Sequence, residues 1–261
     1  MRFIIVSVGW QCAEFMERTL VSIKAQSVGN WESHIRYDPS DDNGAEMIER
    51  WCDEREGFNG QINTDRRFAV RNQYEAIVAA HPAGDDIIVF LDLDGDQLAH
   101  EHVLRDLAGH YADGTLLTYG SYRPVPDPGT TGPAVPFPKD VVRNNAYRKH
   151  MLSGTGCCFN HLRTMSGRVF NAIPENHFHW SSGPKRGEWY EAGTDYIFMV
   201  AGLELAGGRY KFIPDVLLLY NHANPNADYL YHPAEADACT RQYLSRPPLS
   251  PLPPLIWSPD V

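Results

Sequence analysis

Hydrophobic and polar positions follow two distinct periods along this chain. Short β-branched apolar runs predict buried strands, whereas apolar residues spaced three or four apart predict amphipathic helices. The predicted strands cover residues 2–8, 31–38, 87–91, 114–122 and 210–222. The predicted helices cover residues 12–26, 45–55, 67–81, 102–112 and 193–208. Because strands and helices mostly alternate, the pattern indicates an α/β fold with a mostly parallel sheet between layers of helices.

The second half of the chain is less regular. Residues 123–138 are rich in proline and glycine and predict a long loop, and loops of this length are often functional. Prolines recur from about residue 233 onward, and proline disfavours regular helix and central strand. We therefore expect one domain over residues 1–232, followed by a proline-rich tail over residues 233–261 that lies on the surface or lacks regular structure.

Composition narrows the class of protein. The 261 residues, 43% of them hydrophobic, suffice for one large α/β domain with its own core. No apolar run approaches the roughly 18 residues that span a bilayer. The apolar start is not followed by a small-residue cleavage site, so it predicts a strand rather than a signal peptide. Five cysteines without CxxC or zinc spacing predict reduced thiols, and we expect a cytoplasmic protein.

Charge bears on the possible partners. The formal net charge of −10 disfavours nonspecific binding to nucleic acid. Residues 143–150 are the one basic run. Such a run is either a solvated face or a contact with phosphate groups, and both interpretations stay open.

An acidic cluster follows the predicted strand at residues 87–91. Asp92, Asp94 and Asp96 stand at alternate positions directly after it. Ligands of open parallel sheets bind at the carboxyl ends of the strands. Unpaired carboxylates this close would raise one another's pKa, and a divalent cation with a phosphate would neutralise them. Their oxygen atoms suit a hard cation such as Mg²⁺ or Mn²⁺.

The acidic cluster allows other interpretations. A solvated acidic turn that caps a helix is the simplest. A calcium loop of the EF-hand type requires glycine and glutamate where this chain has Gln97 and Val103, so it is excluded. The letters DLDG also resemble the signature of haloacid-dehalogenase-like phosphatases, although Asp96 stands where those enzymes have threonine. A phosphatase and a non-catalytic binder of sugar nucleotides therefore stay as alternatives.

Several segments, taken in order, resemble one enzyme family. They are VSVGWQCAEFMERTLVSIKAQSVGNWESHIRYDPSDDN, RFAVRNQYEAI, DLDGDQLAHEHVL and GTDYIFMVAGLELAGGRYKFIPDVLLLYNHANPN. Together they resemble family-2-like glycosyltransferases of the GT-A fold, above all a bacterial and phage subset, over about residues 4–230. Tyr37 departs from the family pattern, which has an acidic residue at that position.

The resemblance implies a function and a cofactor. It implies a GT-A α/β fold and transfer of a sugar from a nucleotide donor, such as a UDP-sugar, to a hydroxyl group with inversion. It also implies Mn²⁺ or Mg²⁺ at a DxD motif, bridging the donor's diphosphate. The acceptor stays open among a glycan, a lipid-linked intermediate, a protein side chain and a hydroxymethylated base in phage DNA.

The same resemblance assigns roles to individual residues. Asp195, at the start of the predicted helix 193–208, is the expected general base. The residues expected to bind the nucleotide donor are Val8, Gly9, Trp10, Asp38, Arg71, Asp92 and Asp94. The residues expected to bind the metal are Asp94, Asp96 and His222. Trp180, Trp189 and Tyr190 belong either to the acceptor site, stacked on a sugar, or to the core.

Overall fold

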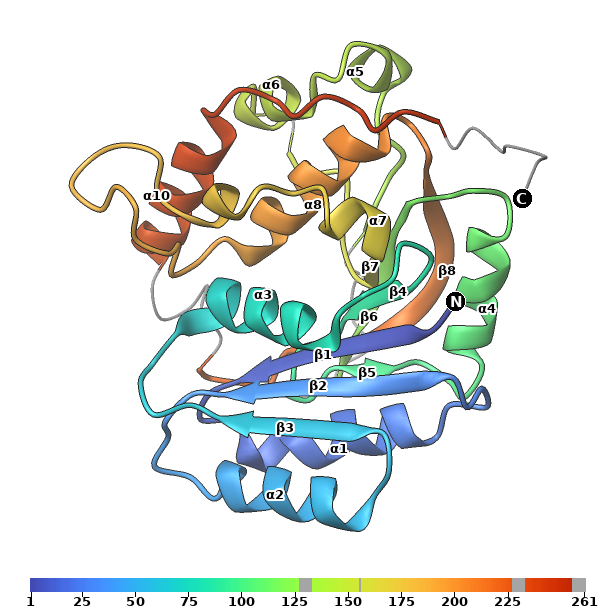
Figure 1. Ribbon diagram of the computed structural model, residues 1–261, viewed down its shortest axis with the longest axis vertical. Helices are drawn as coiled ribbons and strands as arrows, with labels where there is room; N and C mark the ends of the chain where they lie inside the picture. Colours follow the sequence, from blue (N-terminus) through green and yellow to red (C-terminus); the bar gives the residue numbers. More distant parts are fainter. Residues whose placement is uncertain (127–132, 155, 227–232, 255–261) are drawn as a thin grey trace.

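In the part of the chain that the structure describes, the sheet has eight strands in the order β3-β2-β1-β4-β7-β6-β8-β5. The computed structural model describes residues 1–126, 133–154, 156–226 and 233–254 (Figure 1). The strands are β1 (Phe3–Gly9), β2 (Trp31–Tyr37), β3 (Phe58–Ile62), β4 (Ile87–Phe90), β5 (Gln97–Leu98), β6 (Leu117–Val125), β7 (Arg163–Ser166) and β8 (Tyr210–Asn221). Only β7 and β5 run against the others, so the mostly parallel sheet is confirmed.

Helices cover both faces of the sheet. They are α1 (Ala13–Lys24), α2 (Gly44–Glu54), α3 (Phe68–Ala80), α4 (Val103–Tyr111), α5 (Lys139–Arg143), α6 (Tyr147–Leu152), α7 (Gly167–Phe170), α8 (Thr194–Ala206) and α10 (Pro233–Leu244). Figure 1 shows α3 and α8 on one side of the sheet and α1 and α2 on the other. Along β1, Ile4 and Val6 belong to the core cluster under α3 and α8, whereas Phe3 and Ile5 belong to the cluster under α1 and α4. This alternation is typical of a strand buried on both faces.

The hydrophobic pattern did not predict three of the described strands: β5, which has only two residues, and β3 and β7. β3 is an edge strand in which only Phe58 is fully buried, so it shows no apolar run. β7 is buried throughout, yet its sequence is the mostly polar RTMS. β3 and β7 are fixed by pairing with β2 and β4 rather than by their own composition.

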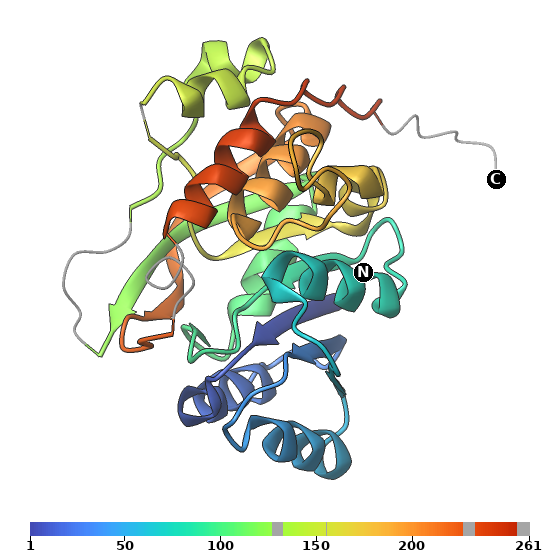
Figure 2. The same cartoon turned by 90° about the vertical axis from the view of Figure 1, so that its left-hand side faces the viewer.

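The expectation for residues 233 onward is wrong for the first twelve of them. Residues 233–244 form α10, which packs against α6 and α8 (Figure 2). Pro233 stands at the first position of the helix, where proline is tolerated. Cys239 and Tyr243 of this helix are buried against the core. Beyond α10 the chain runs extended over the end of α8, where the Leu252 N–H donates to the Leu205 carbonyl at 2.8 Å.

A buried ion pair holds α6, α8 and α10 together. The Arg148 guanidinium donates to both carboxylate oxygens of Glu204, at 2.6 and 2.9 Å. It also donates to the Tyr243 carbonyl at 2.5 Å, and Glu204 accepts the Leu249 N–H at 3.0 Å. Arg148 is therefore a structural residue inside the predicted basic run, not part of a solvated face or a phosphate contact.

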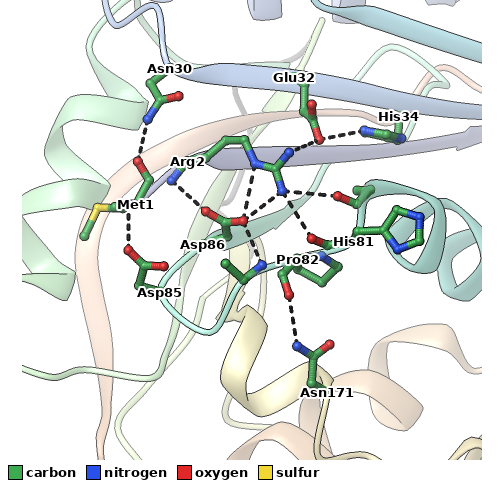
Figure 3. A network of polar contacts seen from close by, with 12 residues as sticks. Met1, Arg2, Asn30, Glu32, His34, His81, Pro82, Asp85, Asp86 and Asn171 are labelled. Carbon is green, nitrogen blue, oxygen red and sulfur yellow. Dashed lines mark hydrogen bonds and ion pairs between the residues drawn. The ribbon is translucent and has the colours of Figure 1, made fainter.

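A polar network ties the amino ends of β1, β2 and β4 (Figure 3). The Arg2 guanidinium contacts Glu32 on β2 and Asp86 before β4, each at 2.8 Å. Glu32 also contacts His34 at 2.9 Å. The network lies at the amino ends of these strands, and the acidic turn lies at the opposite, carboxyl end of β4. Among the described helices, none combines the length and the apolar character needed to cross a bilayer.

Candidate active site

A cavity of about 430 Å³ opens at the carboxyl ends of β1, β2 and β4. The starts of α3 and α8, residues 224–226 and α10 complete its walls. Of the residues predicted to act, the structure brings the following to its lining: Val8, Gly9, Trp10, Asp38, Asp92, Asp94 and Asp195. Arg71, Asp96 and His222 do not line the cavity.

Asp38 joins the end of β2 to the start of α3. One carboxylate oxygen accepts the side-chain amides of Asn63 and Asn72, both at 2.8 Å. The other accepts the backbone N–H groups of Arg67 and Phe68, at 3.0 and 2.9 Å. These are N–H groups that a helix start leaves without a partner. Asp38 thus lines the cavity, and four N–H donors already bind its two carboxylate oxygens.

Phe68, at this same helix start, has a backbone that is unusual for its residue type. Its φ is +61°, a left-handed value that is rare for bulky side chains. Phe68 lines the cavity, and the Asp38 carboxylate holds its N–H. Backbone strain of this kind persists where the surroundings impose it, typically at functional sites.

A cation and two aromatic rings form the wall beyond β1. The guanidinium carbon of Arg66 lies 3.4 Å from the ring centroid of Trp10 and 4.9 Å from that of Phe68. The Trp10 indole donates to the Pro39 carbonyl at 3.1 Å. Sequence reasoning did not single out Arg66. For Arg71 it left a donor contact and a surface salt bridge open; Arg71 forms an ion pair with Glu75 at 2.8 Å, and its donor role stays a prediction. The run RRFAVR offers three arginines, and only the fold distinguishes them.

The acidic turn presents two of its three aspartates to the cavity. Asp92 accepts a hydrogen bond from Gln73 at 3.3 Å, and Asp94 accepts one from Asn224 at 2.9 Å. Gly95 allows the turn because its φ is +103° and a Cβ there would lie 2.7 Å from Asn221 Nδ2. The turn is therefore packed directly against the end of β8.

Asp96 lies beneath the cavity. One of its oxygens accepts the Asn221 N–H at 2.9 Å, and the other is buried with no hydrogen-bond partner among the described residues. Burial, followed by the charges of Asp94 and Asp92, raises the pKa of Asp96 well above its usual range. In this structure Asp96 connects the turn to β8, and its metal role stays a prediction.

His222 is exposed just after β8. Its ring centroid lies 5.0 Å from that of Tyr220 and 5.9 Å from that of Tyr122. Within the described ranges, no three His, Cys, Asp or Glu side chains converge as a metal-binding group. The predicted ligands Asp94, Asp96 and His222 are thus not assembled as a set, and the role of His222 also stays a prediction.

The cavity nevertheless fits a divalent cation that two carboxylates bind and whose coordination shell is completed by water and substrate phosphates. Asp92 and Asp94 present carboxylates at the lining, close enough to Asp96 for their charges to raise its pKa. Mg²⁺ usually binds one or two carboxylates and completes its shell with water and substrate phosphates. A site built from Asp94 and Asp92 matches that pattern.

A buried arginine connects the two acidic sides of the cavity. Arg163 on β7 donates to Asp195 in the first turn of α8, and its other terminal nitrogen lies 3.6 Å from Asp92. Burial lowers the pKa of Arg163, but Asp195, Asp92 and Asp96 more than offset this, so its pKa is raised and it stays charged. The Asp195 side chain is 46% exposed, which leaves it accessible from the cavity.

Sequence reasoning assigned Arg163 no role. None of the segments that carry the family resemblance above includes Arg163. The pairing of Arg163 with Phe90 across β7 and β4 places it beside the acidic turn, and this pairing is a long-range feature that no local motif indicates.

Aromatic residues separate into cavity and core. Tyr196 and Tyr220 line the cavity. Burial and then the nearby aspartates raise the pKa of Tyr220 far above its usual range, so its hydroxyl stays protonated. Trp189 packs against Tyr74, with ring centroids 5.3 Å apart, and Trp180 packs against Tyr190 at 5.2 Å. Both tryptophans are half-buried against the core cluster under α3 and α8 and do not line the cavity, and an acceptor role for them stays a prediction.

Comparisons with known proteins place the fold. No protein-family model matches the sequence, and no curated protein does. Solved structures do match. TarS 1–349 of S. aureus, in complex with UDP-GlcNAc, has a TM-score of 0.60 at 12% identity, over 86% of this chain and 59% of that one. The mannosyltransferase PcManGT of Pyrobaculum calidifontis, with GDP-Man and Mn²⁺, has a TM-score of 0.57 at 16% identity, over 93% and 62%.

A third match is glucosyl-3-phosphoglycerate synthase of Mycobacterium tuberculosis, in complex with Mn²⁺, UDP and phosphoglyceric acid. Its TM-score is 0.58 at 15% identity, over 94% of this chain and 79% of that one. This chain thus spans less than two thirds of the TarS fragment and of the mannosyltransferase. The chain has the GT-A fold of nucleotide-sugar glycosyltransferases, as the sequence resemblance predicted.

Proposed function

We propose that this chain is a metal-dependent glycosyltransferase that moves a sugar from a nucleotide donor to a hydroxyl group with inversion. One observation carries the proposal. In a GT-A fold, a single cavity at the strand ends gathers Asp92 and Asp94 on one side and Asp195 on the other. Carboxylates for a metal-bound diphosphate and for proton removal are the two requirements of this reaction.

The donor site extends along the ends of β1 and β4. The backbone of residues 8–10 and the stacked Trp10 and Arg66 provide a flat, polar-edged wall for the nucleoside. The carboxylates of Asp94 and Asp92 lie where the diphosphate would follow. When bound there, Mn²⁺ or Mg²⁺ supplies Lewis acidity that stabilises the charge on the departing nucleotide. Structural neighbours hold UDP or a nucleotide sugar, which supports a donor of this class.

Asp195 is the proposed general base. It takes the proton from the acceptor hydroxyl as that oxygen bonds to the anomeric carbon, on the face opposite the departing nucleotide. Attack from that face inverts the configuration. General-base assistance of this kind contributes roughly 10²–10⁴-fold in rate. Arg163 holds the carboxylate toward the cavity from behind.

The test is release of nucleotide from a panel of UDP- and GDP-sugars with Mn²⁺. We expect turnover that EDTA abolishes. Asp195→Asn should keep UDP binding, measured by thermal shift, and lose turnover by about 10²–10⁴-fold. Asp94→Asn should lose turnover and, unlike Asp195→Asn, should also weaken Mn²⁺-dependent UDP binding.

The alternatives give different outcomes. Hydrolysis of p-nitrophenyl phosphate without nucleotide release would favour the phosphatase. Donor binding without nucleotide release, in the wild type and in Asp195→Asn alike, would favour the non-catalytic binder.

The five cysteines are free thiols. Free thiols support a reducing compartment, and we propose the cytoplasm.

A further inference from the structure

The wall of the cavity beside Asp195 comes from α10. Ala236, Asp237 and Thr240 of this helix line the cavity together with residues 192–196 at the start of α8. The two segments are in close contact, because a Cβ on Gly193 would lie 3.0 Å from the Thr240 hydroxyl oxygen. Since the proposed donor site lies at the ends of β1 and β4, the side between α8 and α10 is left for the acceptor.

The charges of the lining are strongly unequal. Among the described lining residues Arg66 is the one cation, and it lies at the nucleoside end, stacked on Trp10. The acids are Asp38, Asp92, Asp94, Asp195 and Asp237. Asp38 is bound by backbone and amide N–H groups, and Asp92 and Asp94 belong to the donor side. The acids on the acceptor side are Asp195, which is paired with the buried Arg163, and Asp237, which is paired with the exposed Arg241.

Cations near this mouth are matched by acids. Lys185 contacts Glu191 at 2.6 Å and Glu235 at 2.8 Å, and these hydrogen bonds raise the pKa of Lys185 above its usual range. Arg241 contacts Asp237 at 2.7 Å. A phosphate entering here would therefore meet carboxylates and already paired cations, and like charges at such distances repel.

We infer that the acceptor of this enzyme is an uncharged polyhydroxyl compound, an unphosphorylated glycan, and that Asp237 on α10 excludes phosphate-bearing acceptors. The inference rests on the proposed transferase function. Hydroxyl groups offer hydrogen bonds to Asp237, Thr240 and Thr194, and the ring of Tyr196 offers an apolar face to a sugar. The net charge of −10 acts in the same direction against polyanions such as DNA.

The test compares matched acceptors with one active donor. An array of neutral oligosaccharides is assayed beside the same sugars carrying a phosphate and beside duplex DNA with 5-hydroxymethylcytosine. We expect kcat/KM for the best neutral member to exceed that for its phosphorylated counterpart by about tenfold or more. Preference for a phosphorylated sugar or for DNA would overturn the inference, and so would donor hydrolysis without transfer to any neutral member.

Charge reversal at α10 tests the role of Asp237. Asp237→Lys should raise the relative use of phosphorylated acceptors by about tenfold, and less at high salt. Asp237→Asn should shift it in the same direction by a smaller factor. Asp53→Lys makes the same charge change on exposed α2, away from the cavity, and should leave the ratio unchanged. An equal ratio in the wild type and both Asp237 variants would refute the assignment.

Donor assays separate this inference from the proposed function. UDP binding and slow UDP release in water need no acceptor. If they occur while phosphorylated acceptors are preferred, the inference fails and the transferase function stands. If no donor binds or turns over, the proposed function fails, and the inference fails with it.

Discussion

Arg163 is the residue on which both acidic sides of the cavity depend. It is completely buried, and its guanidinium contacts Asp195 and approaches Asp92 to 3.6 Å. An arginine fork can hold two carboxylates in fixed directions, whereas a lysine provides only a point charge. The expected role of Arg163 is to position Asp195, because Asp195 itself faces the cavity.

Replacing Arg163 should therefore affect turnover more than donor binding. For Arg163→Gln we expect kcat to fall on the order of 10²-fold, with a smaller change in KM for the donor. Arg163→Lys should recover part of kcat. Steady-state kinetics of the two variants provide the measurement. A KM effect alone, or a loss that mirrors a fall in thermal stability, would show that Arg163 only supports the fold.

His177 should make stability depend on pH. Burial, followed by the charges of Arg246 and Arg148, lowers its pKa to about 4. Between that value and about 6.5 the unfolded chain binds the proton and the folded chain does not, so stability is complete above that window and falls as pH falls through it. The loss between pH 7 and pH 5 should be about 2 kcal/mol.

His177→Gln should remove that dependence. The measurement is the free energy of unfolding by urea at pH 7 and pH 5, for the wild type and the variant. Other buried histidines such as His161 act in both proteins, so the difference between the two pH slopes isolates His177. Equal slopes would contradict the prediction.

At the scale of elements, the turn after β4 and the end of β8 form one unit. Gly95 has a left-handed φ and lies against Asn221 and Phe15, while Asn221 also donates to the Asp94 carbonyl at 2.7 Å. The direction of Asp94 therefore depends on a strand that follows it by more than one hundred residues. A local motif can indicate the carboxylates, but only the sheet fixes their directions.

Gly95→Ala should disturb this unit. We expect a loss of about 1–3 kcal/mol in the free energy of unfolding, together with weaker Mn²⁺-dependent UDP binding. Gly109→Ala is a matched control because Gly109 lies in α4 with open space around its Cβ. That control should gain about 0.5–1 kcal/mol. Unchanged UDP binding in Gly95→Ala would show that the turn tolerates a shift of the carboxylates.

The difference between β1 or β4 and the missed strands shows what sequence can predict. β1 and β4 are continuous apolar runs, and the aspartates after β4 stand out as a motif. β3 and β7 carry no such run, because an edge position and pairing within the sheet define them. For the same reason the sequence indicated Asp92, Asp94 and Asp195, whereas long-range packing alone brings Arg66 and Asp237 to the cavity lining and Arg163 into contact with Asp195.

At the scale of the molecule, residues 233–254 belong to the same folded unit as the cavity. Their helix lines the cavity, and the Arg148–Glu204 pair, with Tyr243 and Leu249, attaches it to α6 and α8. Removing one member of a buried ion pair leaves the other charge without compensation, which costs more than the pair itself contributes.

Arg148→Met should therefore lower the free energy of unfolding by about 3–5 kcal/mol. The double variant Arg148→Met, Glu204→Leu should recover much of that loss, since neither charge is then buried alone. Denaturant titration of the single and double variants provides the measurement. If the double variant is as unstable as the single one, the hydrogen bonds to Tyr243 and Leu249 matter more than the charge balance.

The attachment of α10 has a consequence for selectivity under the proposed function. The strands that lead to Asp92 and Asp94 and the helix that carries Asp237 are separate stretches of chain. Exchanging residues 233–244 for another sequence that preserves Cys239 and Tyr243 would retune substrate choice without altering the donor machinery. Under the proposed function, α10 is therefore the element in which substitutions should change acceptor selectivity while the donor site is kept.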